Sequence, residues 1–420
     1  MQPSFLERDT RCRTADAAVA CSIRPIDSAL HSHVSQRYWD WRRLYDADAR
    51  AAPLRHPDCV LSEIEHQPAT QTPPVLIAAE QGGECIGIGA LVPKWVSSRQ
   101  LGGLRIPLRW KGLRLAGGDW LRSGNSPADL PLVLTALNHV LAVGAGFLLV
   151  QDVEVGSPLE DALSRGVPAT WSQFRHAGVQ PHHRIQLPAD KREYWSRFSG
   201  KTLSTMRRKL KKFGVTRLER ITDISQVPRF LEIAHHISLN TWQTRQLGLR
   251  VRNDASELHL LSTLAQHGYL RCYLWFSNGE PVAFIVGNQD KGCFHYEEVG
   301  YATPFAKYSP GQTMLAQVID DLIEFQRPEW FDFGGGDADY KQLFANHTSQ
   351  SGTVWLFPPT LRNRAGLAQL WASWHARRWA RRIVVSSGWA SRARQWVRYG
   401  WSKWCNSGNE SRPPSATQAD

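Results

Sequence analysis

The chain carries the same strand and helix pattern twice. The segments "VLIAAEQGGECIGIGALVP" (75–93) and "CYLWFSNGEPVAFIVGNQ" (272–289) each contain two apolar runs around a glycine-containing turn, which indicates a β-hairpin. Each is followed by an amphipathic helix and a further strand, at 130–153 and at 311–335. A unit of roughly 180–200 residues that recurs in this way predicts a duplicated α/β fold with two similar domains side by side. Chance recurrence of a common α/β pattern is the alternative.

The length of 420 residues and the 18 tryptophans are sufficient for two domains with cores of their own. The expected parts are a loose leader (1–22), an N-terminal domain (23–190), a C-terminal domain (191–359), basic amphipathic helices (360–404) and a disordered tail (405–420). The charged N-terminus argues against a signal peptide, and no apolar run approaches the roughly 18 residues of a spanning helix.

The cysteines of the chain indicate a protein of a reducing compartment, and the histidines give no sign of a metal centre. The 7 cysteines are widely spaced and form no CxxC pair, as expected for reduced thiols of a cytoplasmic protein. The 15 histidines include HxH and HH pairs but no HExxH motif. We therefore expect no metal.

The net charge of +12 comes mainly from the C-terminal segment. Residues 361–404 interleave arginines with tryptophans at positions 371, 374, 379, 389, 396, 401 and 404. Tryptophan beside arginine on an amphipathic helix suits the headgroup zone of an anionic membrane, so peripheral attachment to the inner membrane face is one expectation. Binding to nucleic acid and packing on the domain with the basic side in water are the alternatives.

A second basic segment lies between the two repeats. "YWSRFSGKTLSTMRRKLKKFG" (194–214) predicts a helix that starts near Ser199 or Thr202. Apolar residues recur on it at spacings of three and four, and the opposite face carries Lys201, Arg207, Arg208, Lys209, Lys211 and Lys212. A solvated charged face and an anion-binding face both fit this pattern.

Two short stretches in the second repeat have features of a reaction centre. In "SPGQT", Ser309, Pro310, Gly311, Gln312 and Thr313 precede a helix, whose free N–H groups and positive dipole end suit a pyrophosphate. An ordinary Ser-Pro helix start is the alternative.

The second stretch is "WFDFGGGDADYK" (330–341). It lacks the upstream loops of a protein kinase and the GK[ST] of a phosphate loop. It therefore predicts a strand that ends in a glycine turn and returns Tyr340 and Lys341 towards a cleft.

The basic segment, "YSPGQTMLAQVIDDLIEF" and "FDFGGGDADYKQLFAN" occur in this order, which resembles the GNAT-type N-acyltransferase domain of CelD-like exopolysaccharide and cellulose-biosynthesis proteins. The order is also similar to that of Fem-type peptidyltransferases, which are tandem GNAT units. The resemblance is strongest over 190–357. It implies two α/β domains, each with a mixed, mainly antiparallel sheet flanked by helices. It also implies transfer of an acyl group from acyl-CoA to an amine of a small molecule or a cell-envelope or polysaccharide precursor.

The resemblance places the lysine of a "DxxYK" pattern at the active site, and Lys341 matches it. A fixed cation there would stabilise the negative charge that develops on the thioester carbonyl. A carboxylate base is also required, and Asp337 is the first candidate. Glu297 and Glu298 are the runners-up, and only one of them can face the cleft if they lie on a strand. The first repeat lacks the glycine after its Ser-Pro and the Tyr-Lys pair, so we expect it to be non-catalytic.

Two other functions fit the same residues. A Fem-type transferase would take its acyl group from aminoacyl-tRNA, and the basic helix would then carry phosphates. A non-enzymatic adaptor at a membrane surface could use the same fold without chemistry.

Overall fold

The computed structural model describes residues 10–11, 19–27, 30, 32–66, 72–97, 109–175, 178–239 and 251–386. The predicted disordered tail (405–420) and the last part of the predicted basic helices (387–404) lie outside the described residues, as does most of the predicted leader.

The chain forms two compact units. The first comprises Met1–Val96 and Trp110–Pro359, and the second comprises Ser97–Arg109 and Thr360–Asp420. In the second unit, helix α13 (Leu361–Ser386) is tied to the other segment by Arg362, whose Nη2 donates to the carbonyl oxygen of Arg109 at 2.8 Å. None of the described helices combines the length and the apolar character that crossing a bilayer requires.

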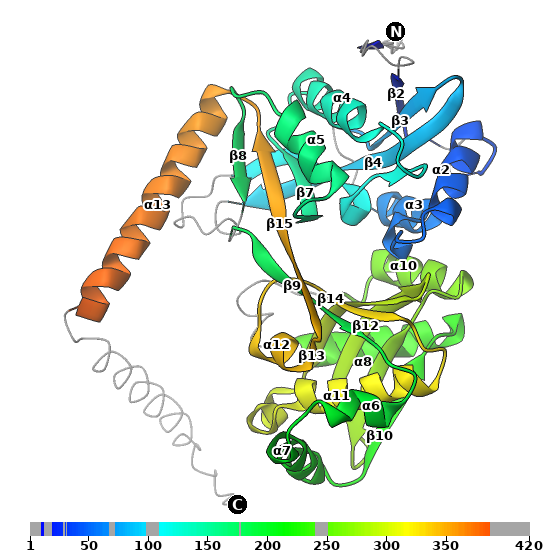
Figure 1. Cartoon of the computed structure of the whole chain (residues 1–420), viewed down its shortest axis with the longest axis vertical. Helices are drawn as coiled ribbons and strands as arrows, with labels where there is room; N and C mark the ends of the chain where they lie inside the picture. The colour runs from blue at the N-terminus through cyan, green and yellow to red at the C-terminus, as the bar shows by residue number, and fades with distance from the viewer. Residues whose placement is uncertain are drawn as a thin grey trace, which may run out of the picture. The chain divides into compact units, whose positions relative to one another are not determined.

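The first unit is built on one large sheet with helices on both faces (Figure 1). The elements up to the middle of the chain are β1 (Thr10–Arg11), β2 (Ala20–Pro25), α2 (Gln36–Ala47), η1 (Pro53–Arg55), α3 (Pro57–Glu65), β3 (Val75–Gln81), β4 (Glu84–Ser97), β5 (Arg109–Leu115), η2 (Ala116–Gly118), β6 (Leu121–Arg122), α4 (Asp129–Ala142), β7 (Leu148–Glu154), α5 (Pro158–Gly166), β8 (Ser172–Arg175) and β9 (Gln180–Gln186).

After two short connecting helices, α6 (Lys191–Ser196) and α7 (Gly200–Lys211), the same plan recurs. The elements are β10 (Thr216–Ile221), η3 (Ile224–Gln226), α8 (Val227–Leu239), α10 (Ala255–Gln266), β11 (Cys272–Ser277), β12 (Glu280–Asp290), β13 (Cys293–Tyr301), η4 (Thr303–Tyr308), α11 (Pro310–Glu324), β14 (Trp330–Gly335), α12 (Asp339–Phe344) and β15 (His347–Phe357).

The strand pairing confirms the predicted duplication. The sheet runs β2-β3-β4-β5-β7 in the first half and β10-β11-β12-β13-β14 in the second. Both predicted hairpins are present, as β3–β4 and β11–β12. In each half one pair is parallel, β5 with β7 and β13 with β14, and the helix between the two strands, α4 or α11, makes the crossover. The sheet is otherwise mainly antiparallel, as predicted.

The two halves exchange their last strands. Strand β9, from the first half, pairs with β14 of the second, while β15, from the second half, pairs with β7 of the first. Strands β9 and β15 also pair with each other at the centre of the sheet. The halves therefore share one continuous sheet, and residues of β7, β9 and β14 meet at their junction.

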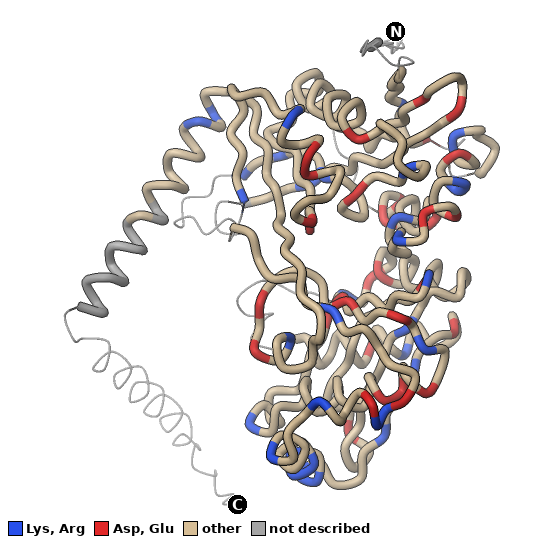
Figure 2. Tube along the Cα trace, viewed as in Figure 1, with Lys and Arg blue, Asp and Glu red and all other residues tan. Residues whose placement is uncertain are grey.

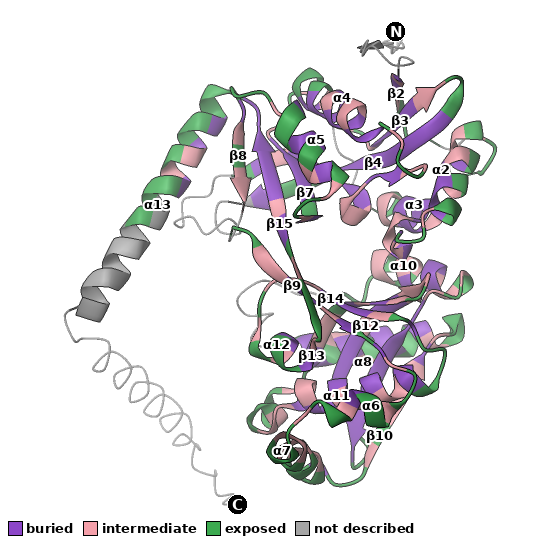
Figure 3. Cartoon of the chain, viewed as in Figure 1, coloured by how far each residue is buried: buried purple, intermediate pink, exposed green. Residues whose placement is uncertain are grey.

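Apolar helix faces form a core on each side of the sheet (Figure 3). In the second half, the predicted apolar face of α11 is confirmed, because Met314, Val318 and Leu322 are fully buried against the strands. Helix α4 packs in the same way in the first half, where Leu132, Ala136 and Val140 contribute to the core. Burial of these stripes, rather than helix propensity, holds the helices on the sheet.

Three β-bulges lie near the junction of the halves. On β7, two residues, Gln151 and Asp152, stand opposite one residue of β15, and Asp152 has φ of 51°. On β14, Phe333 and Gly334 stand opposite one residue of β9, and Gly334 has φ of 67°. Asp152 and Gly334 occupy the same place in the two repeats. On β13, Glu297 is the extra residue opposite β12. Bulges of this kind change the direction in which a side chain points.

Candidate active site

The start of helix α11 forms a positively charged corner. Ser309 adopts the left-handed conformation with φ of 58°, and Pro310 begins the helix, as predicted. The ammonium Nζ of Lys209, on α7, lies 3.1 Å from Ser309 Oγ and 3.2 Å from Gln312 Oε1. An ammonium beside the positive end of a helix dipole is electrostatically unfavourable unless an anion lies between them. The corner therefore suits an anionic ligand.

Further lysines surround this corner. The Nζ of Lys212 lies 5.3 Å and that of Lys307 4.9 Å from the ring centroid of Tyr308, which directly precedes Ser309. Ser199 caps α7 as predicted, by accepting from the N–H of Thr202 at 3.2 Å. In the described part of the chain, the basic side chains of α7 make no ion pair with a carboxylate, and Figure 2 shows them clustered on this helix. The positive field of α7 is thus not neutralised within the described residues.

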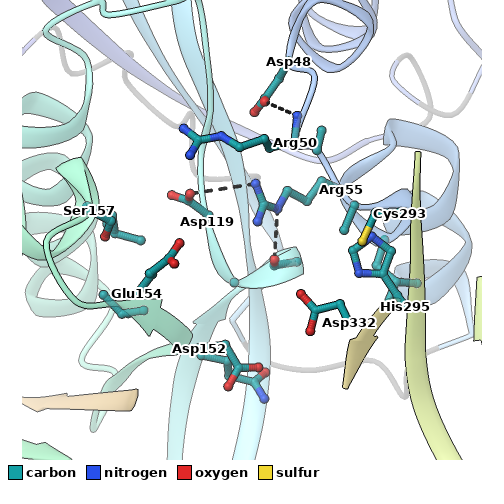
Figure 4. A pocket seen from close by; sticks show the side chains of 18 of the residues that line it. Asp48, Arg50, Arg55, Asp119, Asp152, Glu154, Ser157, Cys293, His295 and Asp332 are labelled. Carbon is teal, nitrogen blue, oxygen red and sulfur yellow. Dashed lines mark hydrogen bonds and ion pairs between the residues drawn. The ribbon is translucent and has the colours of Figure 1, made fainter. Parts of the chain in front are cut away.

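A cavity of about 1190 Å³ lies on the other side of β13 and β14, at the junction of the two halves. The strands and loops of both halves line it, and its charged lining residues are Asp48, Arg50, Arg55, Glu63, Arg114, Asp119, Arg122, Asp129, Asp152, Glu154, Arg184, Asp290, Lys291, Glu297 and Asp332. Figure 4 shows several of these side chains around one space. Carboxylates outnumber Arg and Lys in this list, although the protein as a whole is strongly basic. The cavity therefore favours a cationic or polar ligand.

Asp332 is the most heavily bonded carboxylate of the cavity. Its Oδ1 lies 2.6 Å from Nε2 of His182 and accepts from the N–H of Gly334 at 2.7 Å, while Oδ2 accepts from Nε of Arg184 at 2.9 Å. Burial alone would raise the pKa of Asp332, but His182 and Arg184 outweigh it and hold the pKa below its ordinary value. Asp332 is thus a fixed anion that orients His182 and Arg184, which β9 contributes from the first half.

Two other carboxylates face the same cavity with few partners. Among the described residues, Asp152 makes no hydrogen bond or ion pair, and Glu297 accepts one hydrogen bond, from Nδ2 of Asn288 at 3.1 Å. Both residues are exposed to the cavity, and the surrounding protein lies close enough to shift their titration. Burial raises the pKa of Asp152 and of Glu297. The charge of Asp332 raises both further, whereas His182 lowers the pKa of Asp152 and the hydrogen bond from Asn288 lowers that of Glu297.

The cavity wall also holds Cys293 and His295, and burial dominates their titration. Burial lowers the pKa of His295 to about 4 and raises the pKa of the Cys293 thiol to about 12. These two residues and Asp332 have side chains of metal-binding type within reach of one another. The oxygens of Asp332 are already bound to His182, Arg184 and a backbone N–H, and the guanidinium opposes a cation there. The absence of a metal from the reaction stays a prediction.

Lys341 holds the glycine turn that follows β14. Its Nζ donates to the carbonyl oxygens of Phe333 at 2.9 Å, Gly334 at 3.3 Å and Gly335 at 3.0 Å. An ammonium group has three donors, and these three carbonyls take them all. Burial lowers the pKa of Lys341, and the nearby carboxylates act against this effect. The structural task of Lys341 is evident, whereas its direct contact with a substrate stays a prediction.

The other predicted residues of this segment take different positions. Tyr340 packs against the rings of Phe333 and Tyr296, with centroids 6.1 and 6.5 Å away. Asp337 is more than a third exposed and binds His183 Nε2 at 3.0 Å. Hydrogen bonds from Gln342 and His183 lower the pKa of Asp337, which makes this carboxylate a weaker base than Glu297.

Of the site residues predicted from the sequence, one lines the cavity and the others do not. Glu297 lines the cavity, while Glu298, Asp337, Tyr340 and Lys341 are not among the lining residues. Ser309, Pro310, Gly311, Gln312 and Thr313 do not line it either, because they lie at the start of α11. The hydroxyl of Thr313 donates back to the carbonyl oxygen of Ser309 at 3.1 Å.

Sequence reasoning missed the residues of the first half that enter the cavity. The segment "QPHHRIQ" on β9 places His182 and Arg184 on Asp332 and places His183 on Asp337. An HH pair followed by Arg within a strand was the available signal, but its partners lie about 150 residues away.

The start of α4 differs chemically from the start of α11. The first residue of α4 is Asp129, which is buried, and Arg122 Nη2 lies 3.2 Å from its Oδ1. Burial raises the pKa of Asp129 to about 6, although Arg122 acts in the opposite direction. A carboxyl group thus occupies the place in the first half where the second half has an open, basic helix start.

Comparison with known proteins finds one family that matches part of the second half. Residues 197–342 match the family described as acetyltransferase (GNAT) domain. No curated protein matches the chain.

Solved structures with a similar fold include FemX, at 15% identity and a TM-score of 0.45, with 69% of this chain and 88% of that chain covered. The C-terminal domain of a putative lysylphosphatidylglycerol synthetase from Agrobacterium fabrum is similar at 13% identity and a TM-score of 0.47, covering 79% and 95%. A tandem GNAT protein from the clavulanic acid biosynthesis pathway is similar at 10% identity and a TM-score of 0.46, covering 81% and 99%.

Proposed function

We propose that the protein is an N-acyltransferase of GNAT type that transfers an acyl group from acyl-CoA to an amine. The observation that carries this proposal is the start of α11, where free N–H groups, Lys209 and two neighbouring lysines face one corner. A diphosphate would supply the negative charge that this arrangement lacks. The match of residues 197–342 to the GNAT acetyltransferase domain supports the same chemistry.

The pairing of β13 with β14 supports a path for the acyl arm. The two strands pair only from Cys293 to His295 and from Trp330 to Asp332, and no further pairs form towards the start of α11. We infer that the thioester arm enters where the strands part and presents its carbonyl to the cavity. The acceptor amine then approaches from the cavity side. Lys341 would act on the carbonyl only after releasing one of its three backbone acceptors.

Acyl-CoA binding and thiol release test this function. Wild-type protein is expected to bind acetyl-CoA or a longer acyl-CoA and to release thiol when an amine is added. Lys209→Ala is expected to weaken acyl-CoA binding about tenfold, the loss typical of one charge-assisted contact. Lys201→Ala removes an exposed lysine of the same helix and is the matched control. Failure of the wild type to bind any acyl-CoA in calorimetry would reject the proposal.

The acceptor and the location are finer parts of the proposal. We infer an amino sugar, an amino acid or another cell-envelope or polysaccharide precursor, in line with the resemblance to CelD-like proteins. Helix α13 exposes Leu361 by 86% and Trp371 by 64%, and a helix of this kind fits peripheral attachment to an anionic membrane through residues 361–404. Sedimentation with vesicles that contain phosphatidylglycerol, compared with phosphatidylcholine alone, tests the attachment.

An aminoacyl-tRNA donor is the second candidate, and the unpaired basic face of α7 is the observation that favours it. If tRNA were the donor, the affinity would fall steeply with salt, by about one power of the salt concentration for each phosphate contact. Arg207→Ala and Arg208→Ala would then weaken binding of charged tRNA and leave acetyl-CoA binding unchanged. Binding of acyl-CoA without measurable tRNA binding would exclude this candidate.

A further inference from the structure

We propose that Asp152, from the first half, acts with Glu297 of the second half as the site that binds the acceptor ammonium and removes its proton. This inference rests on the proposed N-acyltransferase function and names the class of the acceptor, a primary amine that is cationic in solution. It also changes the role of the first half, which the sequence predicts to be non-catalytic.

Each of the two carboxylates belongs to a bulge of its strand. Asp152 lies in the bulge of β7, and Glu297 is the extra residue of the bulge on β13. Both line the cavity, and the charge of Asp152 raises the pKa of Glu297. Without the bulges, strand alternation alone would fix the direction of each side chain.

The remaining charges of the cavity do not neutralise these two residues. Asp119 is bound by Arg55 and Arg122, Glu63 by Arg114, and Glu154 by Arg184 at 3.8 Å. Asp332 is held by His182 and Arg184. Among the described lining residues, neither Asp152 nor Glu297 forms an ion pair, although the charges of His182 and Lys341 favour the ionised form of Asp152. Two carboxylates without an ion-pair partner, in a cavity with more carboxylates than Arg and Lys, favour a bound cation.

An orphaned nitrogen next to the pair gives independent support for a ligand. Nε2 of His182 is bound to Asp332, while its Nδ1 is buried and has no hydrogen-bond partner. The His182 side chain is 8% exposed and lines the cavity, and its charge affects the titration of Asp152. A buried ring nitrogen without a partner costs free energy unless a ligand atom fills the place. A polar substituent of the acceptor would fill it.

The pair Asp152 and Glu297 takes one proton from the ammonium, which leaves a neutral amine with a free electron pair. The amine attacks the thioester carbonyl, a C–N bond forms and the C–S bond breaks. The departing thiolate takes the second proton from the nitrogen, which yields an amide and a thiol. The proton held by the carboxylates then passes to solvent through the cavity.

Two classes of acceptor separate this proposal from its alternatives. Thiol release from acetyl-CoA is measured with glucosamine, lysine and ethanolamine, which are protonated at neutral pH, and with hydroxylamine, which is not. Asp152→Asn and Glu297→Gln are expected to lower kcat/KM for the protonated amines by about 10²–10⁴-fold, the range of general base catalysis. With hydroxylamine the loss is expected to stay below about tenfold, because no proton has to be removed before attack.

Asp161→Asn is the control, because Asp161 lies on α5, is exposed, is paired with Arg165 and does not line the cavity. It is expected to keep activity within about threefold of the wild type. The acetyl-CoA dissociation constant and the melting temperature of each variant show whether fold and donor site are intact. Equal losses of Asp152→Asn with glucosamine and hydroxylamine, or no loss at all, would overturn the role of Asp152. Use of hydroxylamine but none of the three protonated amines would overturn the acceptor class, whereas failure to bind acetyl-CoA would reject the proposed function itself.

Discussion

The two halves of the first unit have the same scaffold but carry their charged residues at different points of it. At the crossover helix, the first half begins with buried Asp129, whereas the second begins with Pro310 and Gly311 beside Lys209. At the strand bulge, the first half has Asp152 and the second has Gly334. Two residues before the bulge positions, Val150 of the first half corresponds to Asp332 of the second.

These differences show how a duplicated fold can divide its tasks. A carboxyl group at the start of α4 repels an anion, so the first half cannot hold a diphosphate where the second half can. The second half in turn has no carboxylate at the bulge of β14, whereas the first half has Asp152 at the equivalent bulge of β7. The exchange of β9 and β15 brings both sets of residues to one cavity. Swapping equivalent residues between the halves therefore tests which differences matter.

The largest effect on stability is expected for Asp332→Val. This variant has at position 332 the residue type of Val150, its equivalent in the first half. The change removes the carboxylate that binds His182 and Arg184 and leaves the guanidinium of Arg184 with only the more distant Glu154. Loss of one partner of a buried ion pair typically costs about 3–5 kcal/mol. Urea unfolding at pH 7 measures the loss in the free energy of unfolding. A cost below about 1 kcal/mol would show that the network does not hold the halves together.

The same variant has a pH signature. The pKa of Asp332 is held below its ordinary value in the folded protein, so its contribution to stability is present above the unfolded pKa of about 4 and is lost as the pH falls below it. The stability difference between wild type and Asp332→Val is therefore expected to narrow from pH 7 to pH 3. Urea unfolding at both pH values measures this difference, and a constant gap would contradict the assignment.

The next effect concerns the donor corner. Gly311→Asp gives α11 the charge that Asp129 gives α4, and it is expected to weaken acyl-CoA binding about 100-fold, or roughly 2.7 kcal/mol. The protein has space for the new side chain, because the nearest atoms to an added Cβ are those of Tyr301 and Val299 at 3.8 Å. Gly311→Ala is the control for bulk without charge and is expected to stabilise the helix by up to about 1 kcal/mol. Equal affinities of the Asp and Ala variants would remove charge as the cause.

A smaller effect is expected at the equivalent position of the first half. Burial raises the pKa of Asp129 to about 6, so its ionisation destabilises the folded protein as the pH rises from about 4 through 6. Asp129→Asn removes this cost and is expected to raise the free energy of unfolding by about 1–2 kcal/mol at pH 7 and by little at pH 4. Thermal unfolding at the two pH values measures the change, and Arg122 keeps Asp119 as its partner. A variant less stable than wild type at pH 7 would contradict the raised pKa.

Local signals made much of the fold predictable. The Gly83 and Gly279 turns marked the hairpins, Ser199 marked the start of α7, and the apolar spacing of Met314 and its neighbours marked the face of α11. Each of these depends on residues close together in the chain, where turn and helix chemistry act.

The cavity could not be predicted in the same way. Its central contact, His182 to Asp332, spans 150 residues and depends on β9 crossing to the other half. The direction of Asp152 and Glu297 depends on bulges that no local pattern announces. For Lys341 the sequence pattern predicted the residue but not its contacts. Its three carbonyl partners depend on the conformation of the glycine turn.

The smallest effect on stability is expected at the bulge of β7, where one variant separates stability from activity. Asp152 adopts a left-handed conformation with φ of 51°, in which Gly334 is free of strain at the same place of the second half. Asp152→Gly relieves a conformation that costs about 1 kcal/mol in a residue with a side chain and removes an unpaired carboxylate. We therefore expect the variant to unfold at a slightly higher urea concentration than the wild type, while thiol release with glucosamine falls as in Asp152→Asn. A residue kept only for its fold would show the reverse, a less stable protein with unchanged turnover, so the two measurements together decide whether the first half retains Asp152 for chemistry.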